Sequence, residues 1–513
     1  MATGGASQGA TGNQDLDGLL SGSRWDGTSI TYNFPTGAGY YPADYNGANN
    51  EPASFVAVSA SFQSMVRDAL HQYELVANVT FTEVGAGDAA NISVARTGNL
   101  NGFSGYGYNP GSAARAGDVW FLSSTAQVGD SEVRGRGTWR LVMHELGHAL
   151  GLKHSQDAGG VANTPMTAAH DYNDYSIMSY RRTLGGSTSD NAPEPFGSPQ
   201  TPMMYDIAAL QTMYGANYGT QGGNSVYTWS PTTGQAFIDG VGQTAPGANR
   251  IYGTLWDGGG IDTYDLSNYA TDLRLDLRPG ESSTFSNDQL AVTDTRDGTR
   301  AGGNVFNALL FNGNAASLIE NAVGGMGNDL ITGNQADNML MGGAGNDTML
   351  GGVGNDTVFG NQGGDVLFGN QGNDTLFGGQ SQDTLFGGQN EDVVLGNLGD
   401  DVVLGNLGND TVYGGQGADT LYGGQNDDVL SGDLGDDVLS GDLGADRYLF
   451  GRNSGVDLVL GFSQAQGDRL DFSGQTYALG SAANGDALFT LSGGGTVELA
   501  GVTQAQVGAG FFT

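Results

Sequence analysis

The sequence predicts an α+β fold, in which an N-terminal domain with a mixed sheet and helices is followed by an all-β C-terminal roll of parallel strands. Three observations predict this fold. A segment with helical periodicity carries histidines at positions 144, 148 and 154. Short strand-like segments precede it. From residue 324 a nine-residue unit repeats without insertion, and such a period is typical of coils that stack on one another.

Composition excludes several classes of protein. The 513 residues are enough for two to four domains, and none is cysteine, so no disulfide framework holds them together. The 55 acidic residues outnumber 18 basic ones, which makes nucleic acid an improbable partner. No apolar run approaches the roughly 20 residues of a transmembrane helix. The first thirty residues lack the features of a secretory signal peptide, and we expect residues 1–22 to be a leader or short propeptide.

Residues 23–220 are expected to form an α/β domain. Apolar side chains recur at helical spacing in residues 61–76, whereas residues 78–84, 91–96 and 117–124 have the composition of strands. An extended peptide could add to an exposed edge of the resulting sheet.

The stretch HELGHALGLKH lies at the end of a second predicted helix, residues 138–152. His144 and His148 are four residues apart and therefore share one face of that helix. Gly151 can end the helix and turn the chain back, so that His154 reaches the same point in space. Three imidazoles that leave a fourth position open are typical of a catalytic zinc site.

Glu145 follows the first histidine and suits the chemistry of such a site. Zinc lowers the pKa of a bound water to about 7. Glu145 can accept the released proton and pass it to a leaving amine. The sequence therefore predicts a hydrolytic site that acts through a zinc-activated water, with Glu145 as the general base.

The repeat array consists of fourteen consecutive units from Gly324 to Leu449. Position one is always Gly, position eight is always apolar, and position six is Asp except at Asn338. Position two is only Gly, Asn or Asp, the residues that tolerate left-handed backbone angles. We expect each unit to form a tight turn followed by a three-residue strand. A disordered linker would not keep one apolar residue in phase every nine positions.

The array carries 19 Asp, one Glu and one Arg, a net charge of −19. Stacked unit charges about 4.8 Å apart repel by roughly 0.9 kcal/mol even at the dielectric constant of water. Calcium accepts six to eight oxygen ligands and would relieve this repulsion, by roughly 1.4 kcal/mol per ion at a tenfold excess over its dissociation constant. The array is therefore expected to fold outside the cell, where calcium is abundant. The expected calcium ligands are the position-six carboxylates: Asp329, Asp347, Asp356, Asp365, Asp374, Asp383, Asp392, Asp401, Asp410, Asp419, Asp428, Asp437 and Asp446.

These motifs together resemble those of the serralysin family. The extended pattern H-E-x-x-H-x-x-G-x-x-H is that of metzincin metalloproteases, which carry a downstream Met-turn, and SIMSY supplies Met178 and Tyr180. The nine-residue units resemble the RTX calcium repeat. The resemblance implies that His144, His148 and His154 bind one catalytic zinc ion. It also implies that Met178 lies beneath the metal and that Tyr180 is a displaceable zinc ligand that can stabilise an oxyanion.

The same resemblance extends to other segments. It implies a β-rich lead-in at 221–323, the β-roll at 324–449, and a roll cap with a type I secretion signal at 450–513. It places the substrate-binding edge at Gly105, Tyr106, Gly107 and Tyr108, and additional calcium ligands at Asp257, Gly259, Asp262 and Glu320.

Some residues depart from the family pattern or admit a simpler interpretation. Ser155 stands where serralysins usually have proline, and Asn224 replaces an expected calcium-binding aspartate. His71 and His170 are expected to be surface residues, and Asp206 is expected only to cap or anchor its helix.

The chain is thus expected to be a secreted, calcium-stabilised zinc endopeptidase of a Gram-negative bacterium. Its expected partners are protein or peptide substrates and the type I secretion machinery, with no nucleic acid and no transmembrane segment, and it is expected to be a monomer. The alternative is a calcium-dependent cell-surface or matrix protein, in which the RTX array is the working part and the protease domain is inactive or only self-processing.

Overall fold

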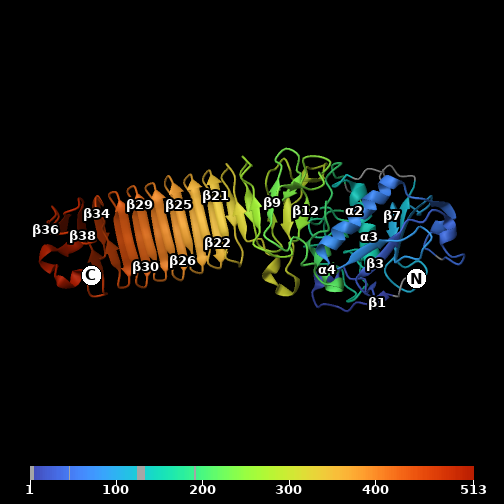
Figure 1. The fold of residues 1–513 in the computed structure, drawn as a ribbon, viewed down its shortest axis with the longest axis horizontal. Helices are drawn as coiled ribbons and strands as arrows, with labels where there is room; N and C mark the ends of the chain where they lie inside the picture. The colour runs from blue at the N-terminus through green and yellow to red at the C-terminus, as the bar shows by residue number, and fades with distance from the viewer. Residues whose placement is uncertain (1–4, 46, 124–132, 190–191) are drawn as a thin grey trace. The chain divides into compact units, whose positions relative to one another are not determined.

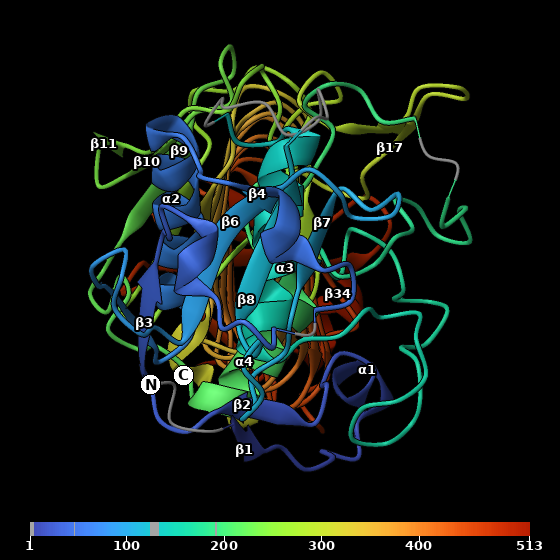
Figure 2. The ribbon, with the colours of Figure 1, turned by 90° about the vertical axis from the view of Figure 1, so that its right-hand side faces the viewer.

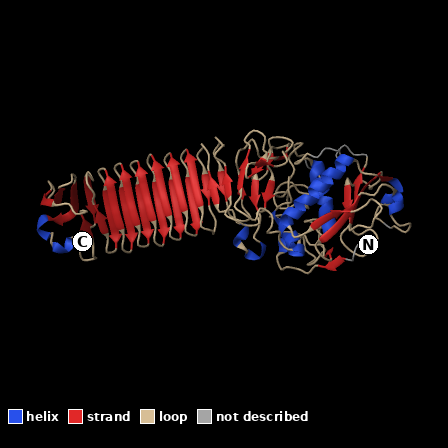
Figure 3. Ribbon diagram, viewed as in Figure 1, coloured by secondary structure: helices blue, strands red, loops and turns tan. Residues whose placement is uncertain are grey.

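A computed structural model describes residues 5–45, 47–123, 133–189 and 192–513. The chain forms two compact units, which are described separately below. Unit 1 comprises Met1–Gly260 and Pro279–Ser317, and unit 2 comprises Ile261–Arg278 and Leu318–Thr513. All α-helices in the described part of the chain belong to unit 1, whereas unit 2 is built almost wholly of strands (Figure 1, Figure 3). This division confirms the predicted fold class.

Unit 1 contains the predicted mixed sheet. Its strand order is β5, β3, β6, β8, β7, with parallel pairing except at β7, an edge strand antiparallel to β8. The short strand β4 also pairs with β6. The bounds are β3 (Ser29–Asn33), β4 (Phe55–Val56), β5 (Thr80–Glu83), β6 (Ile92–Thr97), β7 (Gly105–Gly107) and β8 (Asp118–Leu122). Each of the three predicted strand segments contains an observed strand, and the last residue of 117–124 lies outside the described residues.

Three long helices contribute many of the side chains of the main core of unit 1. They are α2 (Ala60–Val76), α3 (Gly137–Leu150) and α4 (Met204–Tyr214). Their apolar faces are buried together, as the predicted helical spacing requires. The helix α3 runs beside β7 and β8 (Figure 2). It ends where predicted, because its C-cap Gly151 has φ 112°, a left-handed conformation that favours glycine.

The sheet separates this main core from a smaller one. Side chains alternate along β8, so that Val119 and Phe121 lie in the core with the helices. Trp120 instead lies in a second cluster on the other face, with aromatic residues that include Tyr41 and Tyr45. This second face is lined by loops rather than by helices.

The described part of the predicted leader packs into unit 1. The strand β1 (Gly5–Ser7) pairs with β2 (Ser23–Trp25), and the short helix α1 (Gln14–Asp17) lies between them in the chain. Leu19 and Leu20 are both 0 % exposed. The remainder of unit 1 consists of short strands: β9 (Val226–Trp229), β10 (Ala236–Ile238), β11 (Val241–Gly242), β12 (Gly253–Leu255), β15 (Ser282–Ser283), β16 (Val292–Asp294), β17 (Thr299–Arg300) and β18 (Val305–Asn307).

Unit 2 is a parallel β-roll. Successive nine-residue repeats alternate between two sheets, so that most strands of the roll pair in parallel with the strand 18 residues further on. The strands are β13 (Thr263–Asp265), β14 (Arg274–Asp276), β19 (Asn321–Val323), β20 (Leu330–Thr332), β21 (Met339–Ala344), β22 (Thr348–Val353), β23 (Thr357–Gln362), β24 (Val366–Gln371), β25 (Thr375–Gln380), β26 (Thr384–Gln389), β27 (Val393–Leu398), β28 (Val402–Leu407), β29 (Thr411–Gln416), β30 (Thr420–Gln425), β31 (Val429–Leu434), β32 (Val438–Leu443) and β33 (Arg447–Leu449).

Two predicted features of the repeat are confirmed, and one is wrong. The apolar residue at position eight is 0 or 1 % exposed in every unit, from Ile331 to Tyr448. Position two has positive φ in every unit from Gly343 to Asp442. Most strands, however, contain six residues rather than three. Pairing between coils continues beyond the position-one glycine into positions two and three of the next unit.

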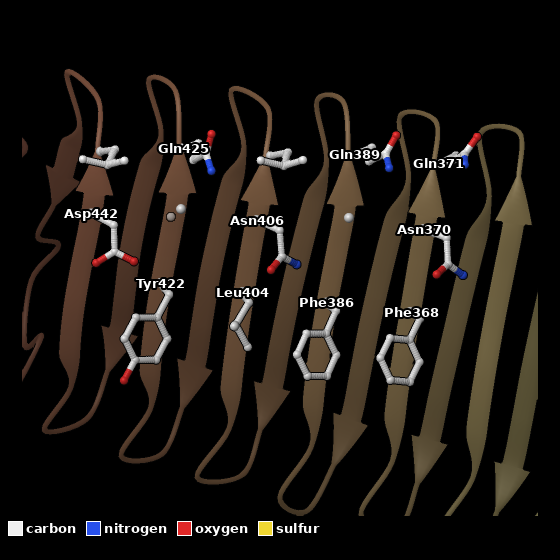
Figure 4. A pocket seen from close by; sticks show the side chains of 15 residues that line it. Phe368, Asn370, Gln371, Phe386, Gln389, Leu404, Asn406, Tyr422, Gln425 and Asp442 are labelled. Carbon is white, nitrogen blue, oxygen red and sulfur yellow. The ribbon is translucent and has the colours of Figure 1, made fainter.

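The outer face of the roll carries ordered rows of side chains. Position-nine residues of alternate units, among them Phe368, Phe386, Leu404 and Tyr422, form one row on a sheet (Figure 4). The rings of Phe368 and Phe386 are stacked, with centroids 4.8 Å apart.

The end of unit 2 closes the roll. Its strands are β34 (Val456–Leu460), β35 (Arg469–Asp471), β36 (Tyr477–Ser481), β37 (Asp486–Leu491) and β38 (Thr496–Thr503). The last three pair antiparallel in the order β38, β37, β36, which ends the parallel stacking.

Candidate metal centre

The three predicted histidines converge in unit 1. One ring nitrogen from each of His144, His148 and His154 can be chosen so that the three lie within 4.8 Å of one another. His144 and His148 lie one turn apart on α3, and the left-handed Gly151 reverses the chain and brings His154 back to them.

The hydrogen bonds of the histidines show that the site fits a cation. The Nδ1 atoms of His144 and His148 lie 2.9 Å from the carbonyl oxygens of Ile177 and Leu152, respectively. A carbonyl oxygen can only accept, so each Nδ1 carries the proton and each Nε2 presents a lone pair. The Nε2 atoms of His148 and His154 are nevertheless 3.0 Å apart. Two lone pairs this close repel each other unless a positive ion lies between them.

The third histidine is held by a carboxylate. His154 Nδ1 lies 2.9 Å from Asp157 Oδ2. Such acceptors on the outer ring nitrogen orient metal-binding imidazoles and raise their basicity. Burial lowers the pKa of all three histidines, that of His148 to about 3, so the rings are neutral and able to bind a metal.

Glu145 is buried beside the histidines and against the edge strand. Burial raises the pKa of its carboxyl to about 8, although a hydrogen bond from the Gly107 backbone and the charge of Arg140 lower it again. A Cβ atom on Gly105 would lie 2.8 Å from Glu145 Cγ, and one on Gly107 would lie 2.3 Å from the Glu145 carbonyl oxygen. Because neither glycine has a side chain, the edge strand β7 can lie directly against Glu145 of α3.

Tyr180 and Met178 also lie at this site. The Tyr180 hydroxyl is 2.8 Å from His154 Nε2, the atom predicted to bind the metal. Met178 is 0 % exposed, and its sulfur faces Gly147 of α3 so closely that a Cβ there would lie 2.9 Å away. The structure thus brings Tyr180 to the histidines and Met178 against α3, and the roles of both residues remain predictions.

Two further residues hold the Met-turn: Asp206, which is buried, and Arg140, which is partly buried. Sequence reasoning gave Asp206 a lesser role and did not identify Arg140. Asp206 was expected only to cap or anchor its helix. It accepts hydrogen bonds from the hydroxyl of Ser176 at 2.6 Å and from the backbone of Ile177 at 2.8 Å, as well as from the α4 N-cap. Arg140 donates to the Ile177 carbonyl at 3.2 Å. Arg140 lies one turn before His144 on α3, which is the only sequence signal that could have revealed it.

Ser155, the departure from the family pattern, is part of a buried network. Its hydroxyl donates to Asp171 Oδ1 at 2.5 Å, and the same oxygen accepts from the Ser179 hydroxyl at 2.7 Å. Arg181 forms an ion pair with the other oxygen of Asp171. The residue after His154 is thereby joined to the Met-turn. This link could not be predicted from the sequence, because Asp171 lies outside both the zinc-binding motif and the Met-turn.

The remaining histidines lie elsewhere in unit 1. The side chain of His71 is 57 % exposed and faces Glu74. His170 is partly buried, and its Nδ1 lies 2.7 Å from Asp15 Oδ2.

Of the predicted calcium residues before the repeats, Asp257 in unit 1 and Asp262 in unit 2 are buried. In unit 1, Asp257 is 1 % exposed and accepts from the Gly259 backbone at 2.6 Å. In unit 2, the Asp262 backbone donates to Glu320 Oε2 at 2.7 Å. Burial and the neighbouring Asp262 raise the pKa of Glu320 to about 7. Their binding of calcium remains a prediction.

The position-six aspartates of the roll show an arrangement that fits calcium. One oxygen of each carboxylate accepts the backbone N–H of the residue 18 positions earlier, for example Asp383 from Asp365 at 2.8 Å. The other oxygen, Oδ2, is buried and has no hydrogen-bond partner among the described residues. A buried carboxylate oxygen without a partner is costly, and a row of such oxygens calls for cations. These residues are Asp347, Asp356, Asp365, Asp374, Asp383, Asp392, Asp401, Asp410, Asp419, Asp428, Asp437 and Asp446.

The first two nine-residue repeats differ from the others. Asp329 uses both oxygens, which accept from the backbones of Leu273 and Gly325. Asn338 replaces the carboxylate of the second unit by a neutral amide, whose nitrogen donates to the Glu320 carbonyl at 2.7 Å. The Asn338 side chain therefore has hydrogen-bond partners of its own and, unlike the aspartates at this position, does not call for a cation.

The three-histidine site and the β-roll have the features of a metallopeptidase domain and of an RTX roll, and the comparisons with known proteins agree. Residues 42–191 match the model of metallo-peptidase family M12. Residues 323–455 are covered by overlapping matches to the RTX calcium-binding nonapeptide repeat. Zinc and calcium are the ions of these two families.

The relatives are serralysins and similar metalloproteases. The chain is 32 % identical to the metalloprotease AprA of Pseudomonas entomophila over 62 % of each chain. It is 33 % identical to serralysin C of Dickeya chrysanthemi over 54 % of each chain, and 31 % identical to the serralysin of Proteus mirabilis over 61 % of this chain and 62 % of that protein. The chain thus spans about three fifths of the length of these relatives. Over these parts it is similar to serralysins, as the motifs indicated. No helix in the described part of the chain is long and apolar enough to cross a membrane.

Proposed function

We propose that the chain is a zinc endopeptidase stabilised by calcium. One observation carries the proposal: two unprotonated imidazole nitrogens lie 3.0 Å apart next to a buried glutamate and a tyrosine hydroxyl. His144, His148 and His154 would hold the zinc ion. When bound, zinc supplies an activated water and polarises the carbonyl of the scissile peptide bond.

The chain's own residues perform the proton transfers in this proposal. Glu145 is the general base, and its raised pKa suits a group that must both accept a proton and return it to the leaving amine near neutral pH. Tyr180 is positioned to donate its hydroxyl to the oxyanion of the transition state.

The substrate is proposed to bind along the edge strand β7. Among the described residues this strand pairs with β8 alone, so its other side can form backbone hydrogen bonds with an extended peptide. Gly105 and Gly107 would bring that peptide next to Glu145, with Tyr106 and Tyr108 as flanking contacts. Backbone recognition of this kind supports a protein or peptide as the substrate.

The roll is proposed to couple folding to export. Its free carboxylate oxygens support calcium binding, and calcium is scarce inside cells and abundant outside. The chain would therefore leave a Gram-negative cell unfolded, through the type I secretion machinery, with the signal in residues 450–513, and act as an extracellular monomer. The proposed divisions remain 1–22, 23–220, 221–323, 324–449 and 450–513.

The deciding experiment is casein digestion by the purified chain in millimolar calcium, with and without a zinc-selective chelator. We expect digestion that the chelator abolishes and added zinc restores. Absence of digestion by material that contains one zinc per chain would instead favour the calcium-dependent surface or matrix protein, in which the protease domain is inactive or only self-processing.

A further inference from the structure

A second candidate site lies on the sheet face opposite α2 and α3. A hollow of about 950 Å³ is formed there in unit 1 by residues 36, 37, 39–42, 86, 87, 89, 90, 111–114 and 116, with Ser93 and Asp118 also in its wall. We call it the Asp118 hollow. Asp118 begins β8 and alternates with Val119, which points to the helices, so the hollow is on the opposite side of the sheet from the zinc-type site. Its volume is in the range of small-molecule sites.

The charge within the hollow comes from one buried carboxylate. Asp118 is 5 % exposed, and its Oδ2 atom has no hydrogen-bond partner among the described residues. Burial and the nearby Glu51 raise its pKa well above the usual range, whereas the hydroxyls of Tyr45 and Ser93 lower it. No cation is among these groups. A buried acid left in this state is unfavourable unless a positively charged donor reaches it.

Two aromatic residues, Tyr40 and Tyr41, line the hollow together with this carboxylate. Tyr41 is 6 % exposed, lines the hollow, and its hydroxyl also has no partner in the described part of the chain. Its ring packs edge-on against those of Tyr40 and Tyr45, at 5.1 and 5.3 Å. Trp120 lies 4.7 Å from it. Aromatic faces next to a carboxylate are the surroundings in which proteins bind organic cations.

We propose that the Asp118 hollow binds a primary ammonium group, with the Asp118 carboxylate as its counter-ion and the Tyr41 hydroxyl as a further acceptor. An ammonium group has three donors and one positive charge, so it can satisfy both unpartnered oxygens at once. A phosphate or carboxylate ligand would be repelled by Asp118 and by the net charge of −37. The rest of the wall is mainly glycine, alanine and proline, which suits a short alkyl chain rather than a large polar group.

The ammonium group could belong to a free amine or to the amino terminus of a peptide. Calorimetric titration of the full-length chain, saturated with calcium and zinc, with n-butylammonium chloride tests the shared chemistry. The neutral 1-butanol is the matched control compound. A short peptide amide, with its amino terminus free or acetylated, distinguishes the sources by displacing bound butylammonium or failing to do so. About 0.3 M salt suppresses non-specific attraction of cations to the acidic surface.

Three variants sharpen the test. Asp118→Asn preserves the shape of the side chain and is expected to weaken butylammonium binding by about tenfold or more. Tyr41→Phe keeps the carboxylate and is expected to weaken binding by a smaller factor, so the proposal stays testable if the first variant folds poorly. Asp88→Asn removes one charge from the exposed 86–90 loop and should leave binding unchanged.

The proposal is supported if butylammonium binds, butanol does not, and Asp118→Asn alone among the charge variants weakens binding. It is overturned if the wild-type chain binds no butylammonium, or if Asp118→Asn and Asp88→Asn weaken binding equally. Because the hollow and the histidines lie on opposite faces of the sheet, neither outcome depends on whether the chain is a peptidase.

Discussion

At the scale of single residues, the metal centre depends on which atoms carry protons. The carbonyl oxygens of Ile177 and Leu152 fix the proton of two imidazoles on Nδ1 and free the opposite nitrogen for a metal. Glu145 is buried next to these neutral rings, and the same burial that keeps them uncharged raises its own pKa to about 8. The exclusion of water therefore shifts the pKa values of both the histidines and Glu145.

Replacement of Glu145 tests its role directly. Glu145→Ala removes the proposed base and leaves all three histidines in place, so we expect a stoichiometric content of zinc and a loss of peptidase activity of about 10²- to 10⁴-fold. Zinc analysis and digestion of a fluorogenic peptide measure the two quantities. Full activity in the variant would refute the assignment.

Ser155 provides a second residue-scale prediction. Ser155→Ala leaves Asp171 without one of its donors inside the protein, which we expect to cost about 1–3 kcal/mol of unfolding free energy in unit 1. The loop that carries His154 should also hold zinc less tightly, because Asp171 no longer joins it to the Met-turn. Thermal denaturation and competition with a zinc chelator provide the measurements. An unchanged zinc affinity would show that the network only stabilises the fold.

At the scale of elements, the important contact is that between the edge strand β7 and the helix α3. Two glycines allow the strand to lie against Glu145 and His148 with no side chain between them. The strand keeps one side free for a peptide because the sheet ends there. Access of the substrate and position of the base are therefore set by the same packing.

A methyl group at Gly107 should disturb this packing. In Gly107→Ala the new Cβ would lie 2.3 Å from the Glu145 carbonyl oxygen, so the strand must move away from α3. We expect a loss of about 1–3 kcal/mol in stability and a raised KM for peptides, with zinc still bound. Gly137→Ala at the start of α3 is the matched control, because a Cβ there meets nothing within 4 Å. Equal kinetics for the two variants would contradict the edge-strand proposal.

At the scale of the whole molecule, the free energy of the roll depends on its acidic residues. Twelve buried carboxylates have an oxygen with no partner among the described residues, and they repeat along the roll at the spacing of its units. Their repulsion and desolvation oppose folding, while the buried apolar residue at position eight favours it. Bound calcium would offset the repulsion and desolvation of the carboxylates, so that apolar burial can fold the roll.

Removal of calcium should therefore unfold unit 2. We expect circular dichroism in a calcium chelator to lose its strand signal and to regain it on calcium addition. Asp392→Asn should raise the calcium concentration at the midpoint of refolding, because it removes one buried ligand. Glu391→Gln removes the same charge at an exposed neighbouring position and should leave the midpoint nearly unchanged. Identical shifts in the two variants would mean that only net charge matters.

The roll should also respond to pH when calcium is absent. Burial and neighbouring aspartates raise the pKa of Asp392 and Asp428 to about 8, whereas an unfolded aspartate has a pKa of about 3.9. Between these values the folded state binds more protons than the unfolded state, so stability falls as pH rises. Without calcium, unit 2 should therefore retain more of its strand signal in circular dichroism at about pH 5 than at about pH 8. A stronger strand signal at the more alkaline pH would contradict this account.

The sequence alone determined the elements that repeat or follow a period. The helix with His144 and His148, its end at Gly151, the phase of the roll and its left-handed position two were all predictable, because each depends on local backbone preference or on burial at a fixed spacing. Residue types at motif spacing likewise indicated zinc and calcium. The length of the roll strands was not predictable, because pairing between coils 18 residues apart extends them.

Only the tertiary structure decided the support of the site and the second hollow. Asp171 links Ser155 to Ser179, and Asp206 links α4 to the Met-turn, through hydrogen bonds between segments far apart in the chain. Asp118 becomes a buried, partly unpartnered acid because three loops and a sheet face close around it. These hydrogen bonds and this burial depend on which distant segments come together in the folded chain. The order of residues within one segment does not reveal that.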